Sequence, residues 1–217
     1  MSGAERSSDA NGSIRVLVAD DHPVVRTGLT AVLVQQPDLQ LVAEAENGER
    51  AVALYREHRP DVCLMDLRMP VMDGVEAIRT ITTEFPSARI LALTTYEGDA
   101  DIRRALEAGA RGYLLKDMLL TDVIRAVRAV HRGERVIPNA VAARLAEFPD
   151  RSDLTERELE ILQLVARGLS NKEAARAIGR TDETVKIHLK NVFTKLGVAD
   201  RTEAVTVALT RGLIHLD

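Results

Sequence analysis

Hydrophobic residues in the first two thirds of the chain follow a repeating order of short β-branched runs and amphipathic segments. The runs are Ile14–Ala19, Gln40–Ala45, Asp61–Met65, Arg89–Leu93 and Gly112–Leu115. Segments of about a dozen residues with apolar positions at helical spacing lie between them. Near-continuous apolar strands that alternate with helices form parallel sheets covered on both faces. The pattern therefore predicts an α/β, doubly wound domain with a five-stranded parallel sheet over residues 14–130.

The alternation stops after residue 130. Residues 131–153 hold Gly133, Pro138 and Pro149 among scattered charges, which predicts a linker with a short helix over residues 140–146. Residues 1–13 are polar, which predicts a frayed tail.

Capping residues mark four helix starts in the last part of the chain. Thr155, Ser170 and Asp200 each stand three positions before a glutamate, which is the spacing of a capping box, although Asp is the looser match. Thr181 precedes two acidic residues at positions that the helix dipole favours. The pattern predicts an all-α domain of four helices over residues 154–217.

Composition excludes several classes of protein. Of 217 residues, 46% are hydrophobic and 29% are charged, so the chain can bury a core. Cys63 is the only cysteine, which excludes an internal disulfide framework and fits a reducing compartment. The sequence shows neither the roughly 20-residue apolar run of a membrane span nor the apolar stretch of a signal peptide. We therefore expect a cytoplasmic protein that does not contact a membrane.

The two predicted domains differ in the sign of their charge. Residues 1–150 hold 18 Lys and Arg against 23 Asp and Glu, whereas residues 151–217 hold 11 against 10. The second part is too weakly basic for its charge alone to predict nucleic-acid binding.

Charged and hydroxyl side chains stand at four of the predicted strand ends. Asp20 and Asp21 follow the first strand, Asp66 ends the third, Thr94 ends the fourth, and Lys116 follows the fifth. The carboxyl ends of parallel strands meet at one edge of the sheet, where ligands bind. Three carboxylates with no His or Cys expected beside them favour Mg²⁺ or Mn²⁺. With a hydroxyl and an ammonium, such a set suits a phosphoryl group that a carboxylate attacks.

The third predicted helix of the second domain has one apolar and one partly basic face. Val185, Leu189, Val192 and Leu196 form a stripe at helical spacing. Lys186 flanks the opposite face, which carries Ile187 and Lys190. Three residues separate this helix from the preceding one, as in a helix-turn-helix, and its exposed face suits a DNA major groove.

Motifs in the first domain occur in a characteristic order. They are Asp20-Asp21-His22-Pro23, Asp66-Leu67-Arg68-Met69-Pro70-Val71-Met72-Asp73-Gly74, Leu93-Thr94-Thr95 and Gly109-Ala110-Arg111-Gly112-Tyr113-Leu114-Leu115-Lys116-Asp117. They resemble the receiver domain of bacterial two-component response regulators, which has a flavodoxin-like fold.

This resemblance implies a role for each motif residue. Asp66 would accept a phosphoryl group from a phosphohistidine of a sensor histidine kinase. Mg²⁺ would be held by three carboxylates and one main-chain carbonyl: Asp20, Asp21, Asp66 and Arg68. Thr94 would bond the phosphoryl oxygen, Lys116 would pair with it, and Tyr113 would be a rotamer switch.

Motifs in the second domain also match a known family. Leu154-Thr155-Glu156-Arg157-Glu158, Gly168-Leu169-Ser170-Asn171-Lys172-Glu173-Ala174-Ala175 and Thr184-Val185-Lys186-Ile187-His188-Leu189-Lys190-Asn191 resemble the LuxR-type DNA-binding domain. Together the two domains resemble the NarL/FixJ class of response regulators. The resemblance implies contacts to double-stranded DNA from Asn171, Lys172, Thr184, Lys186, Ile187 and Lys190.

The same resemblance implies a regulatory protein rather than an enzyme. It would be a transcriptional regulator that phosphorylation activates. It would bind a pseudo-palindromic promoter site as a homodimer through its last helix, with the receiver as a possible second contact.

Two other functions remain open from the residues. A phosphatase of the haloacid dehalogenase type needs a second Asp two positions after the nucleophile, where this chain has Arg68. A transcription factor controlled by a partner or ligand, independently of phosphorylation, is the other alternative. We also hypothesise that Arg68 and Tyr96 shield the phosphoryl group from water.

Overall fold

A computed structural model describes residues 12–95, 98–118, 120–147 and 154–216. Contacts divide the chain into two compact units. One comprises Met1–Thr95 with Arg104–Pro138, and the other comprises Tyr96–Arg103 with Asn139–Asp217.

The first unit contains the predicted five-stranded parallel sheet. Its strands are β1 (Ile14–Ala19), β2 (Leu39–Ala45), β3 (Val62–Asp66), β4 (Ile90–Thr94) and β5 (Gly112–Leu115). Their order is β2-β1-β3-β4-β5, and every neighbouring pair is parallel. The chain reverses its direction of winding between β1 and β3, which is where such sheets bind ligands. The predicted fold class is confirmed.

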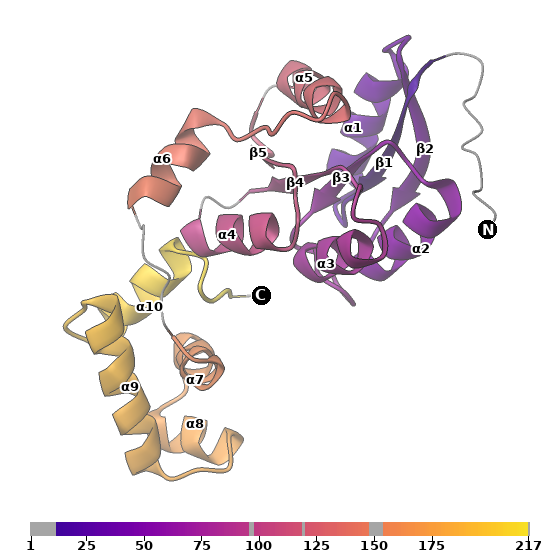
Figure 1. Ribbon diagram of the computed structural model, residues 1–217. Helices are drawn as coiled ribbons and strands as arrows, with labels where there is room; N and C mark the ends of the chain where they lie inside the picture. Colours follow the sequence, from indigo (N-terminus) through magenta and orange to yellow (C-terminus); the bar gives the residue numbers. More distant parts are fainter. Residues whose placement is uncertain (1–11, 96–97, 119, 148–153, 217) are drawn as a thin grey trace. The chain divides into compact units, whose positions relative to one another are not determined.

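Helices cover both faces of this sheet (Figure 1). Helices α1 (Pro23–Val34) and α5 (Leu120–His131) lie on one face, while α2 (Gly48–His58) and α3 (Gly74–Glu84) lie on the other. Helix α4 (Asp99–Glu107) precedes β5.

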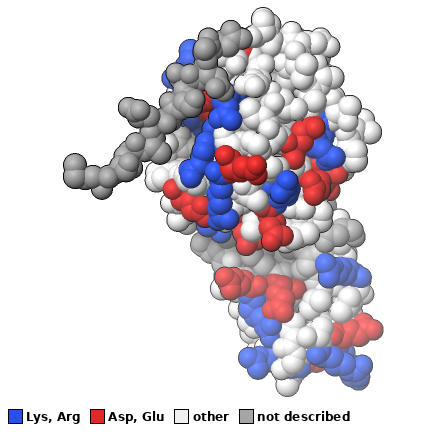
Figure 2. All heavy atoms as spheres, turned by 90° about the vertical axis from the view of Figure 1, so that its right-hand side faces the viewer, with Lys and Arg blue, Asp and Glu red and all other residues white. Residues whose placement is uncertain are grey.

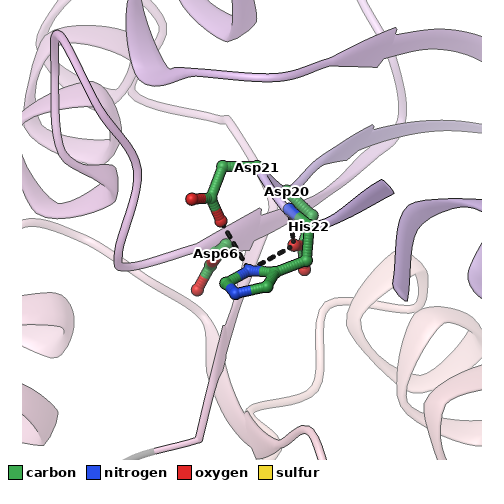
Figure 3. Close-up of side chains that lie close together, drawn as sticks. All are labelled: Asp20, Asp21, His22 and Asp66. Carbon is green, nitrogen blue, oxygen red and sulfur yellow. Dashed lines mark hydrogen bonds and ion pairs between the residues drawn. The ribbon is translucent and has the colours of Figure 1, made fainter. Parts of the chain in front are cut away.

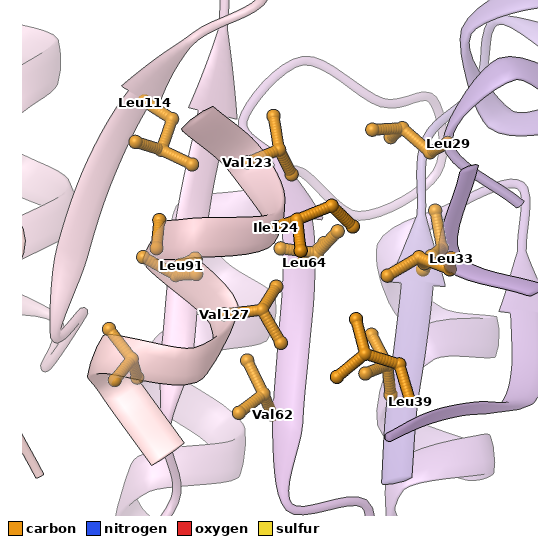
Figure 4. Close-up of a cluster of buried hydrophobic side chains, with 14 of the residues drawn as sticks. Leu29, Leu33, Leu39, Val62, Leu64, Leu91, Leu114, Val123, Ile124 and Val127 are labelled. Atoms are coloured by element: carbon orange, nitrogen blue, oxygen red, sulfur yellow. The ribbon is translucent and has the colours of Figure 1, made fainter. Parts of the chain in front are cut away.

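The core beneath α1 and α5 holds the strands in place. Val123, Ile124 and Val127 of α5 pack with Leu64 and Leu91 of the central strands (Figure 4). Val127 and Leu64 are fully buried. Burying a side chain of this size contributes roughly 1.5–3 kcal/mol, so the core fixes the strand ends as a rigid platform.

The start of the predicted linker is attached to the edge of the sheet. Val136 forms a parallel bridge with Gly112. The Tyr113 N–H donates to the Val136 carbonyl at 2.9 Å, and the Val136 N–H donates to the Arg111 carbonyl at 3.2 Å. The backbone of β5 therefore holds the chain just before it leaves the first unit.

The second unit contains five helices among the residues described. They are α6 (Asn139–Glu147), α7 (Glu156–Ala166), α8 (Asn171–Ala177), α9 (Asp182–Leu196) and α10 (Arg201–Thr210). The short linker helix predicted over residues 140–146 and the four later helices are confirmed. None of the helices in the described ranges is long and apolar enough to cross a bilayer.

The predicted helix caps all form. Thr155 and Ser170 make complete capping boxes with Glu158 and Glu173. Thr181 accepts a hydrogen bond from the Thr184 N–H, and Asp200 accepts one from the Glu203 N–H. Because each cap satisfies an orphan amide and contributes about 1 kcal/mol, local sequence fixes where these helices begin.

Gly112 permits the close approach of the linker. A Cβ at this position would lie 2.7 Å from the Val136 carbonyl oxygen and 2.6 Å from Leu91 Cδ2. We expect Gly112→Ala to detach residues 134–138 and to destabilise the first unit by about 1–3 kcal/mol. Hydrogen exchange of the Tyr113 amide should accelerate.

Gly28→Ala is the matched control for this experiment. A Cβ at Gly28, inside α1, meets nothing within 4 Å. It should stabilise the helix by about 0.5–1 kcal/mol and leave exchange at Tyr113 unchanged. Unaltered exchange at Tyr113 in Gly112→Ala would contradict the docking of the linker.

Candidate functional site

The ends of β1, β3 and β5 bring two carboxylates and an ammonium together. Asp20 and Asp66 are buried, at 0% and 1% exposure. Lys116 Nζ lies 2.8 Å from Asp20 Oδ2 and 2.8 Å from Asp66 Oδ2. The shared ammonium offsets the repulsion between two anions in a water-poor site.

Backbone hydrogen bonds position these side chains. The Asp20 N–H donates to the Ala45 carbonyl at 3.0 Å, and the Lys116 N–H donates to the Thr94 carbonyl at 2.7 Å. The second bond places the buried Thr94 of β4 beside Lys116. The strand-end convergence expected from the sequence is therefore present for Asp20, Asp66, Thr94 and Lys116.

The loop after β3 turns tightly around Asp66. The Arg68 N–H donates to Asp66 Oδ1 at 3.2 Å, and the Gly74 N–H donates to the Leu67 carbonyl at 3.1 Å. A Cβ on Gly74 would collide with the Asp66 carbonyl. A residue without a side chain at position 74 is therefore required for α3 to start directly against the candidate nucleophile.

Two further predicted residues belong to the segments that carry this site. Tyr113, on β5, is fully buried, and Arg68 is half-buried. Tyr96, which the shielding hypothesis pairs with Arg68, lies outside the described residues.

Burial and charge perturb both members of the central ion pair. Burial raises the pKa of the Asp66 carboxyl to about 6; the ammonium of Lys116 opposes the rise and the charge of Asp20 adds to it. Burial alone would lower the pKa of Lys116, but hydrogen bonds and charges from Asp20 and Asp66 outweigh it and raise the pKa. Lys116 is therefore protonated and Asp66 is mostly ionised at neutral pH.

The carboxylates offer donors to a cation. Three buried carboxylate oxygens, Asp20 Oδ2, Asp21 Oδ1 and Asp66 Oδ2, each lie 2.7–2.8 Å from a nitrogen of Lys116 or His22. Three carboxylates supply more acceptor oxygens than these two nitrogens occupy, and such a set fits Mg²⁺ or Mn²⁺.

The structure corrects one expectation about this cluster. The sequence suggested that no histidine lies beside the carboxylates, but His22 Nδ1 lies 2.7 Å from Asp21 Oδ1. One ligand atom from each of Asp20, Asp21, His22 and Asp66 falls within 4.8 Å of all the others (Figure 3). The signal for His22 was its position directly after Asp21, but adjacency along the chain does not say where a side chain points.

Helix α9 presents the face predicted to contact DNA. Val185, Leu189 and Val192 are buried beneath it. Lys186, Ile187 and Lys190 are exposed, Ile187 to 56%. Lys186 Nζ also lies 3.1 Å from Asp182 Oδ2. Lys172 of α8 is exposed, whereas Asn171 and Thr184 are half-buried.

A groove of about 440 Å³ lies between α8, α9 and the start of α10. It is lined by Asn171, Lys186, Leu189, Lys190, Phe193 and Arg201. Arg201 donates to Asn171 Oδ1 at 3.3 Å and to the Val165 carbonyl at 3.1 Å. Arg201 is a cation of this face that the sequence analysis did not single out, because its partners Asn171 and Val165 lie far from it in sequence.

Charges of both signs are interspersed on the face of the molecule drawn in Figure 2. Figure 2 shows one face of the molecule, on which Lys and Arg alternate with Asp and Glu. The positions of particular residues on α9, rather than a broad basic field, therefore define the candidate DNA interface.

Both halves of the chain match known families. Residues 16–128 match the response regulator receiver domain, and residues 152–208 match the bacterial regulatory proteins of the luxR family. The response regulator protein VraR of Staphylococcus aureus (strain Mu3 / ATCC 700698) is 42% identical over 208 residues, which cover 94% of this chain and all of VraR.

Solved structures agree with this assignment. The crystal structure of response regulator ChrA, from a heme-sensing two-component system, is 41% identical, has a TM-score of 0.57, and is matched over 94% of this chain and 100% of ChrA. RcsB of Salmonella enterica serovar Typhimurium, bound to promoter rprA in the presence of the phosphomimetic BeF3-, is 27% identical with a TM-score of 0.63. That match covers 90% of this chain and 98% of RcsB.

The fold and the acidic site, with these matches, define a receiver joined to a helix-turn-helix domain. The chain belongs to the response regulators with a LuxR-type DNA-binding domain. It is thus a two-component transcription regulator activated by phosphorylation, and its family is not one of typical enzymes.

The raised pKa of Asp66 predicts how stability depends on pH. The folded value of about 6 lies above the ordinary value of 3.8, so the folded state binds this proton more tightly than the unfolded state. Ionisation of Asp66 therefore lowers the free energy of unfolding as pH rises between these values. Without divalent cations, Asp66→Asn should be more stable than wild type near pH 7 by up to about 3 kcal/mol.

Urea unfolding across the pH range checks this prediction. The advantage of Asp66→Asn should shrink as pH falls from about 6 and vanish below the ordinary pKa of 3.8, where both states of the wild type hold the proton. A variant of equal or lower stability at neutral pH would contradict the account of the site.

Proposed function

We propose that Asp66 is the phosphoacceptor and that it takes its phosphoryl group from a phosphohistidine of a sensor kinase. A carboxylate oxygen of Asp66 attacks the phosphorus, the phosphorus–nitrogen bond breaks, and the released imidazole takes up a proton. An acyl phosphate on Asp66 results. The observation that carries the proposal is the 2.8 Å contact of Lys116 Nζ with buried Asp66 Oδ2.

Neighbouring groups suit this chemistry. Lys116 places a positive charge where negative charge accumulates on the phosphoryl oxygens, and the hydroxyl of Thr94 is a donor from the adjacent strand end. Asp20, Asp21, Asp66 and the Arg68 carbonyl would hold Mg²⁺, which when bound supplies charge neutralisation at the phosphoryl group. Arg68, which follows Asp66 by two residues, would shield that group from water.

Tyr113 is the switch that carries the change away from Asp66. Phosphorylation adds negative charge that draws Thr94 and Lys116 toward the phosphoryl group. Tyr113 stands three residues before Lys116 on β5, and its N–H is bonded to Val136. A rearrangement at this residue therefore acts on the segment that leads to the second unit.

The second unit binds duplex DNA with the exposed face of α9. Lys186, Ile187 and Lys190 contact bases or phosphates, and Thr184 lies near the start of the same helix. Asn171 and Lys172 of α8 contact the backbone. A homodimer through α10, with the receiver as a possible second contact, would bind a pseudo-palindromic promoter site. The RcsB structure on promoter DNA, at 27% identity, supports this assignment.

Control by a partner or ligand without phosphorylation was the alternative that the sequence left open. The buried carboxylates and their shared lysine favour control by phosphorylation. Burying two anions and a cation costs free energy, and packing alone does not require these charges.

Phosphorylation is tested by intact mass after treatment with acetyl phosphate and Mg²⁺. We expect one phosphoryl adduct in the wild type and none in Asp66→Asn, because the amide is not a nucleophile. Asp38→Asn is the control, since Asp38 pairs with Arg128 away from the site. An adduct that persists in Asp66→Asn would assign the phosphoacceptor elsewhere, and its absence from the wild type would favour the alternative.

DNA binding is tested with Lys190→Ala on the DNA that flanks the gene of this protein. We expect weaker binding and a salt-dependence slope that falls by about 1, because one phosphate contact is lost. Lys195→Ala is the control on the same helix, since Lys195 Nζ pairs with Glu158 at 2.8 Å. Equal salt slopes for Lys190→Ala and the wild type would contradict the assigned face.

A further inference from the structure

His22 lies at the mouth of the acidic site with its ring toward the carboxylates (Figure 3). Its Nδ1 lies 2.7 Å from Asp21 Oδ1 and 3.5 Å from Asp20 Oδ1. The side chain is 64% exposed, whereas that of Asp20 is fully buried. The imidazole therefore stands between solvent and the buried carboxylates.

The backbone around His22 holds the ring in this place. His22 is the N-cap of α1, and Pro23 occupies the first helical position. The His22 N–H donates to Asp20 Oδ1 at 2.9 Å, while its side chain makes no capping hydrogen bond. The hydrogen bond to Asp20 and the start of α1 fix the main chain on either side of His22, and the ring faces the acidic cluster.

We propose that His22 provides a nitrogen ligand to this cation site and so biases the site toward Mn²⁺ and other first-row transition ions relative to Mg²⁺. The inference rests on the proposed cation site of Asp20, Asp21 and Asp66.

Geometry and donor chemistry both support this ligand set. One donor atom from each of the four residues lies within 4.8 Å of the others. An ion with bonds of about 2.1 Å spans about 4.2 Å between opposite ligands, so the four donors are near the reach of one ion. Imidazole suits transition metals, whereas Mg²⁺ prefers oxygen ligands.

Two possible roles of the His22 ring predict different changes in the affinities for Mg²⁺ and Mn²⁺. If His22 only oriented Asp21 through a hydrogen bond, its removal would weaken Mg²⁺ and Mn²⁺ to the same degree. A direct nitrogen ligand affects the two ions unequally. The ratio of the two affinities therefore distinguishes the cases.

The experiment is calorimetric titration of the full chain with MnCl₂ and with MgCl₂ in one buffer at a pH of about 8, because protons compete with metals for imidazole. His22→Ala and His22→Gln should each lose about tenfold or more in Mn²⁺ affinity and less than about twofold in Mg²⁺ affinity. His58→Ala is the matched control, since His58 lies beside Glu57 on α2 and outside the site.

A spectroscopic readout checks the ligand directly. Pulsed electron paramagnetic resonance of bound Mn²⁺ should show a coordinated nitrogen in the wild type and in His58→Ala but not in His22→Ala. Circular dichroism confirms that each variant is folded.

Each remaining result overturns the proposal. Absence of the nitrogen signal from the wild type, or equal losses for the two ions, excludes His22 as a ligand. If both ions bind and neither depends on His22, only this inference fails. If neither ion binds the wild type, the cation site of the proposed function fails with it.

Discussion

The ammonium of Lys116, shared between two buried carboxylates, is the interaction on which the regulatory site depends. Parallel strands deliver Asp20, Asp66 and Lys116 to one edge of the sheet, and two anions at 0% and 1% exposure would otherwise repel each other. The lysine makes this arrangement tolerable, and it leaves carboxylate oxygens available for a cation. Asp20, Asp66 and Lys116 stabilise the unphosphorylated site. A phosphoryl group on Asp66 would add negative charge and rearrange these same groups.

The fold gives such a rearrangement a route toward the second unit. Lys116 follows β5 directly, and the backbone of that strand holds Val136 through Tyr113 and Arg111. Gly112 allows this contact because it has no Cβ. A switch requires an element with two arrangements that both sites influence. If β5 has two arrangements, a change at the acidic site would alter how β5 holds the linker at Val136.

Local and periodic signals made much of the structure predictable from sequence. Thr155 and Ser170 fix helix starts through hydrogen bonds to residues three positions away, so those boundaries need no tertiary information. The meeting of Asp20 and Asp66 followed from one further rule, that the ends of neighbouring parallel strands share an edge. The places of His22, Val136 and Arg201 were not predictable in this way. The bridge of Val136 and the groove beside Arg201 depend on residues far apart in sequence, and the adjacency of His22 to Asp21 does not say where the ring points.

The central claim is that the charge on Asp66 controls binding of DNA by the second unit. Its most direct test is the affinity for DNA flanking the gene of this protein, measured by fluorescence anisotropy with and without beryllofluoride and Mg²⁺. The account predicts that the wild type binds at least about tenfold more tightly with beryllofluoride, a coupling of about 1.4 kcal/mol, and that Asp66→Asn does not respond. An unchanged wild-type affinity, or the same gain in Asp66→Asn, would contradict it.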